Sequence, residues 1–177
     1  TYSVTRGETT FPYSSLLLVG ATHSFILYLN ILLDNAISSS RPEAAHDERA
    51  AFIFEGVDDD KLGDFGLCIG GAASLEIDCV NEELGTPSHA LVVARSQMHT
   101  NIYELVPEEM LQSHPMTDAS QNPQVRADMV FFETPNGGAV FSTGSIGYAG
   151  SLSINGYENN IANLTENVLR RFVVAAA

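Results

Sequence analysis

The sequence predicts an α/β fold, in which strands that form one sheet alternate with helices along the chain. Two observations support this class. Short apolar runs of strand length recur through the middle of the chain, at residues 50–57, 75–80 and 89–94. The last third then adds a strand, a tight turn, a second strand and a helix, in that order.

The first predicted elements lie in a strongly apolar stretch, residues 16–33. His23, Ser24 and Asn30 interrupt this stretch, and no basic residues flank it in the manner of a signal peptide. We therefore expect a buried strand at 15–20 followed by a buried helix at about 23–36, rather than a membrane span.

The middle of the chain begins after a polar connector at residues 38–47, which is the best internal boundary. The run 50–57 is apolar except for Glu55, a pattern typical of a strand buried on both faces. The runs 75–80 and 89–94 predict two further strands. A helix is expected from Pro107, because proline suits the first turn of a helix.

A β-hairpin is predicted next. Residues 129–132 include two phenylalanines and a valine, which suit a buried, pleated surface. Asn136 and Gly137 both accept positive φ at low cost, as a tight connection requires. Residues 139–143 then return as the partner strand.

A closing helix is predicted over residues 160–172. Apolar side chains recur there at helical spacing and form one stripe, which should pack on the sheet. The stripe consists of Ile161, Leu164, Val168, Leu169 and Phe172.

The composition limits the classes of partner that we expect the protein to bind. The chain has 177 residues, enough for one domain with a sizeable core. Eight basic residues against 22 acidic ones give a formal net charge of −14. A nucleic-acid-binding protein needs a basic surface, and an anionic membrane would repel this one. We therefore expect neither partner.

The two cysteines, Cys68 and Cys79, leave two interpretations open. Their spacing is compatible with a disulfide, but Cys68 lies in an apolar run, where a small buried thiol is the simpler interpretation. Because nothing else indicates an oxidising compartment, we expect a cytoplasmic protein. Metal sites need more closely clustered ligands, so the isolated chain is expected to bind neither iron nor zinc.

Glu55 is the first candidate catalytic residue. A carboxylate within an apolar strand is costly to bury unpaired, and burial would raise its pKa into a range suited to proton transfer. The alternative is that Glu55 marks the end of the strand and points into solvent.

His99 is the second candidate. It follows the predicted strand at 89–94, and α/β proteins place functional groups at the ends of strands. The alternative here is a solvent-exposed loop histidine without a catalytic role.

Several segments, taken together, are similar to the sequence of a known family. They are residues 51–57, 63–67, 70–73, 84–87, 135–146, 155–160 and 167–172. Together they resemble the C-terminal region of the N,N-dimethylformamidase large (beta) subunit-like family. The resemblance covers about residues 41–172, with 1–40 as a divergent N-terminal strand and helix segment and 41–177 as the family-like domain of a longer polypeptide.

The resemblance implies a fold like that of the class I glutamine amidotransferases, a mostly parallel sheet flanked by helices. It also implies hydrolysis of the C–N bond of small amides such as N,N-dimethylformamide. Glu55 is the residue that would match an active-site carboxylate, and His99 lies in a stretch similar to the family's Ser-x-x-His segment. The alternative is a non-catalytic structural or interaction domain of a larger assembly.

The family also implies a cofactor and partners. Its iron is held by tyrosine and glutamate side chains, which the resemblance places upstream of this chain, so no metal-binding residue is expected here. The expected partners are a small amide substrate, the remaining large-subunit domains and a small subunit, within an oligomer.

Overall fold

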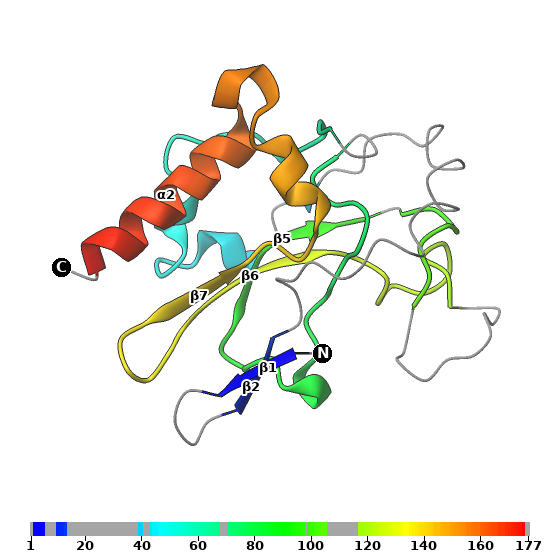
Figure 1. Cartoon of the computed structure of the whole chain (residues 1–177), viewed down its shortest axis with the longest axis horizontal. Helices are drawn as coiled ribbons and strands as arrows, with labels where there is room; N and C mark the ends of the chain where they lie inside the picture. The colour runs from blue at the N-terminus through cyan, green and yellow to red at the C-terminus, as the bar shows by residue number, and fades with distance from the viewer. Residues whose placement is uncertain are drawn as a thin grey trace.

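The computed structural model describes residues 2–5, 10–13, 39–40, 43–67, 71–97, 99–105 and 117–175. Two sheets are present in this part of the chain (Figure 1). A two-stranded sheet pairs β1 (Tyr2–Thr5) with β2 (Thr10–Tyr13). A five-stranded sheet has the order β4-β3-β5-β6-β7.

The strands of the larger sheet are β3 (Ser39–Ser40), β4 (Lys61–Leu62), β5 (Leu91–Ser96), β6 (Asp128–Glu133) and β7 (Ala139–Ser142). Short 3-10 helices lie between these strands and before the last helix: η2 (Glu43–His46), η3 (Ala51–Phe54), η4 (Glu82–Leu84), η5 (Gly147–Ser151) and η6 (Ile154–Tyr157). The chain then forms α2 (Asn160–Ala175).

The predicted fold class is wrong. Every strand pairing in the described part of the chain is antiparallel, and α2 is the one α-helix found there. The described residues therefore form no mostly parallel sheet flanked by helices, and a fold like that of the class I glutamine amidotransferases is not supported. The central strands β5, β6 and β7 instead form a small antiparallel meander.

The apolar run at 50–57 is not a strand. It forms η3 and the turn that follows, and Glu55 comes directly after the helix. Ala50, Ile53 and Val57 are the buried members of the run. Their spacing of three and four residues is that of a helix, so the continuous apolar run concealed a helical burial pattern.

The predicted strand at 75–80 is also wrong. In the described part of the chain it forms an isolated bridge between Ile77 and Ser145 and separate backbone hydrogen bonds, such as that from the Asp78 N–H to the Gly144 carbonyl at 2.9 Å, rather than a continuous strand. Leu75 has a φ of 67°, which breaks the extended conformation at the start of the segment. The strand predicted at 89–94 is confirmed as β5, displaced by two residues.

The C-terminal hairpin is confirmed. β6 and β7 pair antiparallel, with Phe131 opposite Phe141 and Glu133 opposite Ala139. In the turn, the Gly137 N–H donates to the Thr134 carbonyl at 3.0 Å. Gly137 has a φ of 80°, and it is the residue of the Asn136-Gly137 pair that adopts the left-handed conformation.

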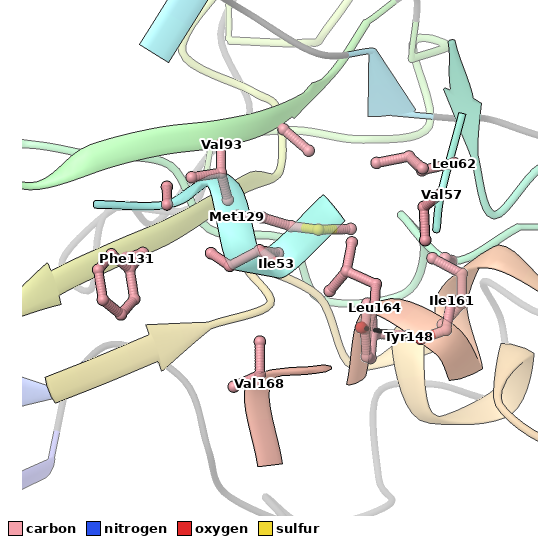
Figure 2. Close-up of a cluster of buried hydrophobic side chains, with 13 residues drawn as sticks. Ile53, Val57, Leu62, Val93, Met129, Phe131, Tyr148, Ile161, Leu164 and Val168 are labelled. Carbon is pink, nitrogen blue, oxygen red and sulfur yellow. Dashed lines mark hydrogen bonds between the residues drawn. The ribbon is translucent and has the colours of Figure 1, made fainter. Parts of the chain in front are cut away.

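The closing helix is confirmed, and α2 extends the predicted range to Ala175. Asn159 caps its start, because the side-chain oxygen accepts the N–H of Ala162 at 2.9 Å. Figure 2 shows Ile53 of η3 packed among side chains of β6 and α2, including Met129 and Leu164. The core therefore lies between the sheet and the layer formed by η3 and α2.

One member of the predicted helical stripe is misplaced. Ile161, Leu164 and Val168 are buried, but 59% of the Leu169 surface is exposed. Leu169 follows Val168 directly, and neighbouring residues on a helix are turned about 100° apart. The buried stripe is therefore narrower than the sequence indicated.

We expect Leu164→Ala to lower the free energy of unfolding by about 2–5 kcal/mol, because the Leu164 side chain is fully buried and its loss leaves a cavity. Leu169→Ala is the matched control on the same helix and should cost less than about 0.5 kcal/mol. Urea unfolding of both variants tests the packing of α2. Equal losses would contradict the observed orientation of the helix.

Three predictions lie outside the described residues: the strand at 15–20, the helix at 23–36 and the helix from Pro107. None of the helices that the structure describes has both the length and the apolar character needed to cross a bilayer.

Candidate functional site

A cavity of about 350 Å³ opens where β5 ends. Its lining comes from residues 95–97, from His99 and from the segment that leads into β6. Six of its lining side chains are polar or charged: Arg95, Ser96, Gln97, His99, Asn122 and Arg126. We call this the His99 cavity.

Ser96 connects the end of β5 with the start of β6. Its backbone N–H donates to the Ala127 carbonyl at 2.9 Å, and the Ala127 N–H donates to the Ser96 Oγ at 2.7 Å. The same Oγ lies 2.6 Å from the Nε2 of His99. The imidazole is therefore positioned by a hydroxyl that the sheet itself holds.

The hydrogen-bond network assigns the tautomer of His99. The Ser96 Oγ accepts from the Ala127 N–H, and its own hydrogen has no other acceptor among the described residues, so we assign that hydrogen to a bond with Nε2. The proton of a neutral imidazole then resides on Nδ1. This atom is buried and has no hydrogen-bond partner among the residues that the structure describes.

His99 is neutral at physiological pH. The residue is only 4% exposed, and burial lowers the pKa of its imidazole to about 4. Its ring also lies against Tyr103, with the ring centroids 4.7 Å apart. Since the pKa in the unfolded chain is near 6.5, His99 should destabilise the fold progressively as the pH falls from about 6.5 to about 4.

A buried carboxylate holds two arginines at the edge of the cavity. The side chain of Asp128 is completely buried, and its Oδ1 accepts from the Arg95 Nε at 2.7 Å. Its Oδ2 accepts from the Arg126 Nη2 at 3.1 Å and from the Val80 N–H at 3.1 Å. The cluster carries two positive charges and one negative charge.

Glu55 occupies a different place. Together with Phe52, Asn167, Arg170 and Arg171, it lines a second cavity of about 280 Å³ between η3 and α2. Glu55 is exposed, and its carbonyl oxygen accepts from the Asn167 Nδ2 at 2.8 Å. The structure therefore does not bring Glu55 and His99 into one cavity.

Of the two candidates, His99 lies at the end of a strand as predicted, but it is buried rather than exposed. Arg95, Arg126 and Asp128 were not identified from the sequence. One signal was available for part of the cluster: Arg95 and Asp128 carry opposite charges and are register partners on β5 and β6. That signal can be used only once the strand pairing is known.

The described residues contain no group of three or more His, Cys, Asp and Glu side chains that could hold a metal ion.

Cys79 is a free, partly buried thiol, and burial raises its pKa. Cys68 lies outside the described residues.

Comparisons with known proteins agree with one another. Residues 29–161 match the family described as N,N-dimethylformamidase beta subunit-like, C-terminal. The N,N-dimethylformamidase beta subunit of Paracoccus aminophilus is 44% identical over 130 residues, and that of Alcaligenes sp is 43% identical over 130 residues.

These alignments cover 73% of the chain, which spans only about 17% of the length of either relative. The family match includes Glu55, His99 and every polar residue named above for the His99 cavity. The chain belongs to the N,N-dimethylformamidase beta subunit-like C-terminal family.

Proposed function

We propose that the chain is part of an amidohydrolase that cleaves the C–N bond of small formamides such as N,N-dimethylformamide. Two relatives named N,N-dimethylformamidase beta subunit support the reaction class. The His99 cavity supports a contact between this segment and the amide. A non-catalytic structural domain of the same assembly is the competing proposal.

The carrying observation is the buried Nδ1 of His99, which has no hydrogen-bond partner among the described residues and is covered rather than open to the cavity. A formamide oxygen would reach it once the side chains that cover it move aside. An unpaired buried donor costs about 1–3 kcal/mol, so such a group calls for an explanation. An amide carbonyl oxygen is a suitable acceptor. In hydrolysis this oxygen gains negative charge as water adds to the carbonyl carbon, and a fixed donor stabilises that charge.

A neutral imidazole is suited to this role. With a pKa of about 4, His99 keeps one N–H and no net charge across the neutral pH range. It would therefore act as a hydrogen-bond donor rather than as a general base, which works best with a pKa near the operating pH. Ser96 would be a positioning residue that fixes the tautomer.

Glu55 is the second proposed catalytic residue, with a role in proton relay, and the family resemblance supports it. Because Glu55 and His99 line different cavities, the two proposals are independent within this chain.

We expect Glu55→Gln to reduce turnover of N,N-dimethylformamide by the intact protein about 10²–10⁴-fold, the range typical of a lost acid or base. The change keeps the shape of the side chain, so the fold should survive. Glu158→Gln, which changes another exposed carboxylate, is the control and should leave turnover unaltered. Equal activity of both variants would reduce Glu55 to a surface carboxylate.

We further propose, as the family resemblance implies, that the iron of the intact protein is held by tyrosine and glutamate residues outside this chain. The remaining large-subunit domains and a small subunit are the proposed partners in an oligomer. The name beta subunit, which both relatives carry, supports such an assembly. The cytoplasmic location stays a prediction.

The proposed function is tested by supplying the intact, assembled protein with N,N-dimethylformamide and measuring release of dimethylamine. We expect amine release in proportion to enzyme, and a loss of this activity in His99→Gln. Absence of amine release from assembled, iron-replete protein would contradict the proposed reaction. Full activity of His99→Gln would instead favour the structural role for this segment.

A further inference from the structure

We propose that the outer edge of β7 pairs with an extended segment of the remaining large-subunit polypeptide, which adds one strand to the five-stranded sheet. β7 is the last strand of that sheet, and its described strand partner is β6 on one side (Figure 1). The identity of the partner rests on the proposed function, because the larger assembly is part of that proposal.

The register of the hairpin shows which backbone groups of β7 point away from β6. In the turn, the Thr134 N–H donates to the Gly138 carbonyl at 2.7 Å. Residue pairs that exchange hydrogen bonds alternate with pairs that do not along an antiparallel ladder. Val140 therefore bonds to β6, whereas the N–H and C=O groups of Ala139 and Phe141 point outward. Among the described residues, these outward groups make no further backbone hydrogen bond.

The opposite edge of the sheet is closed. On the β4 side, the Lys61 carbonyl accepts from the Asn160 Nδ2 at 3.1 Å, and the Gly63 N–H donates to the Asn160 Oδ1 at 3.1 Å. The Gly63 carbonyl also accepts from the Ala72 N–H at 2.8 Å. The Asn160 amide thus takes the place of a further strand. Within the described residues, the sheet has one closed edge and one open edge.

β7 also lacks the features that keep other edge strands from pairing. Proteins guard such edges with charged side chains, with proline or with bulges. The sequence of β7 is Ala-Val-Phe-Ser, without charge or proline, and its register with β6 is continuous. The side chains of Ala139 and Phe141 pack against the core. The sheet therefore holds these residues in place while their outward backbone groups stay available for a partner.

A strand is the kind of partner that fits this edge. Another extended chain presents N–H and C=O groups at the same spacing, so it can bond to Ala139 and Phe141 together. Because β7 carries no charge, an uncharged segment can pair with it without burying an unpaired charge. β-branched and aromatic residues favour the extended conformation, so we expect them in the partner segment.

The remaining large-subunit polypeptide is a better source of that strand than a second copy of this chain. The chain spans only about 17% of the length of either relative, so most of each relative lies outside the matched segment. A segment of the same polypeptide is held near the edge at a high effective concentration. Two copies of this chain would instead bring together formal charges of −14 each, which repel.

The test is amide hydrogen exchange at single-residue resolution in the intact, assembled protein. The amides of Val140 and Ser142, which bond to β6, are the internal control. With a strand on the edge, the amides of Ala139 and Phe141 should exchange within about tenfold of the control rates. Rates at least about 100-fold above the control would show an open edge and overturn the proposal.

A proline variant tests the pairing directly. Ala139→Pro removes one outward N–H, and proline is tolerated where the N–H of an edge strand faces away from the sheet. In the intact protein, the exchange rate of the Phe141 amide should then rise at least about tenfold. Ala139→Val is the matched control, because valine is similar in size but keeps the N–H, and it should leave that rate unchanged. Equal rates in the two folded variants would contradict the pairing. If Ala139→Pro fails to fold, the rates in the unaltered protein decide the question.

The same measurement on the 177-residue chain alone separates the possible sources of the strand. There the amides of Ala139 and Phe141 should exchange rapidly at every protein concentration. Slow exchange in the isolated chain would reject the large-subunit partner, and slowing that grows with concentration would identify a second copy as the occupant.

Failure of this proposal is separable from failure of the proposed function. Fast exchange at Ala139 and Phe141 in an assembled protein that hydrolyses N,N-dimethylformamide rejects the edge pairing alone. Slow exchange in an assembled protein without this hydrolysis supports the pairing and rejects the reaction.

Discussion

Asp128→Asn should lower the free energy of unfolding of the chain by about 3–5 kcal/mol, the range found when one partner of a buried ion pair is removed. The carboxylate is fully buried and accepts hydrogen bonds from two arginines and from the Val80 N–H. In the variant, an amide N–H replaces one acceptor oxygen and faces a guanidinium donor. The arginine side chains, 35% and 20% exposed, can regain only part of their hydration.

Urea denaturation measures this loss, and Asp47→Asn is the matched control. Asp47 also pairs with an arginine, Arg49, but does so at the surface. Surface ion pairs contribute little to stability, so the free energy of unfolding of the control should be close to that of the unaltered chain. Similar losses of unfolding free energy in the two variants would mean that Asp128 does not anchor the edge of the His99 cavity.

His99→Gln should reduce the turnover of N,N-dimethylformamide by the intact protein about 10²–10³-fold, as expected for the loss of one donor to a developing oxyanion. The Gln amide nitrogen can replace Nε2 beside Ser96 but does not reach the position of Nδ1. His99→Asn places its amide close to the Nδ1 position and should retain more activity than His99→Gln. This ordering would distinguish the donor from a merely structural residue.

The control for these variants is His89→Gln. His89 is exposed, and its Nε2 lies 3.0 Å from the Glu133 carbonyl oxygen, outside the cavity. Turnover should be unchanged in this variant, and the Michaelis constant should not move. If His99→Asn and His99→Gln lose activity equally while both fold, the assigned role of Nδ1 is wrong.

The elements that the sequence predicted correctly are those defined by local patterns. The turn at Asn136-Gly137 determines that residues 129–132 and 139–143 pair antiparallel, because the connection is too short for a parallel crossover. The periodicity of α2 likewise depends on residues within four positions of one another. Both patterns are contained in continuous stretches of sequence.

The sheet direction could not be predicted in the same way. β3 pairs with both β4 and β5, and no local signal in Ser39–Ser40 specifies those distant partners. The run at 50–57 was ambiguous because short apolar runs suit a buried strand and a buried helical turn equally well. The α/β class came from the alternation of apolar runs with predicted helices, and the mostly parallel sheet was what the family resemblance implied.

The site was predictable in part. His99 could be found because it follows a strand, and Ser96 because the Ser-x-x-His spacing places a hydroxyl three residues earlier. The role of Arg126 could not be found, since it depends on Asp128 being turned inward on β6. The burial of a charged residue at a strand end can be predicted only when its partners across the sheet are known.

The most direct test of the His99 cavity is an NMR titration of the His99 ring nitrogens in the 177-residue chain. The structure predicts a midpoint of about 4, with the proton on Nδ1 and the lone pair on Nε2 throughout the neutral range. A midpoint near 6.5, the value of an unperturbed histidine, would contradict the burial of the ring. A proton on Nε2 at neutral pH would contradict the assignment of Nδ1 as the unpaired donor.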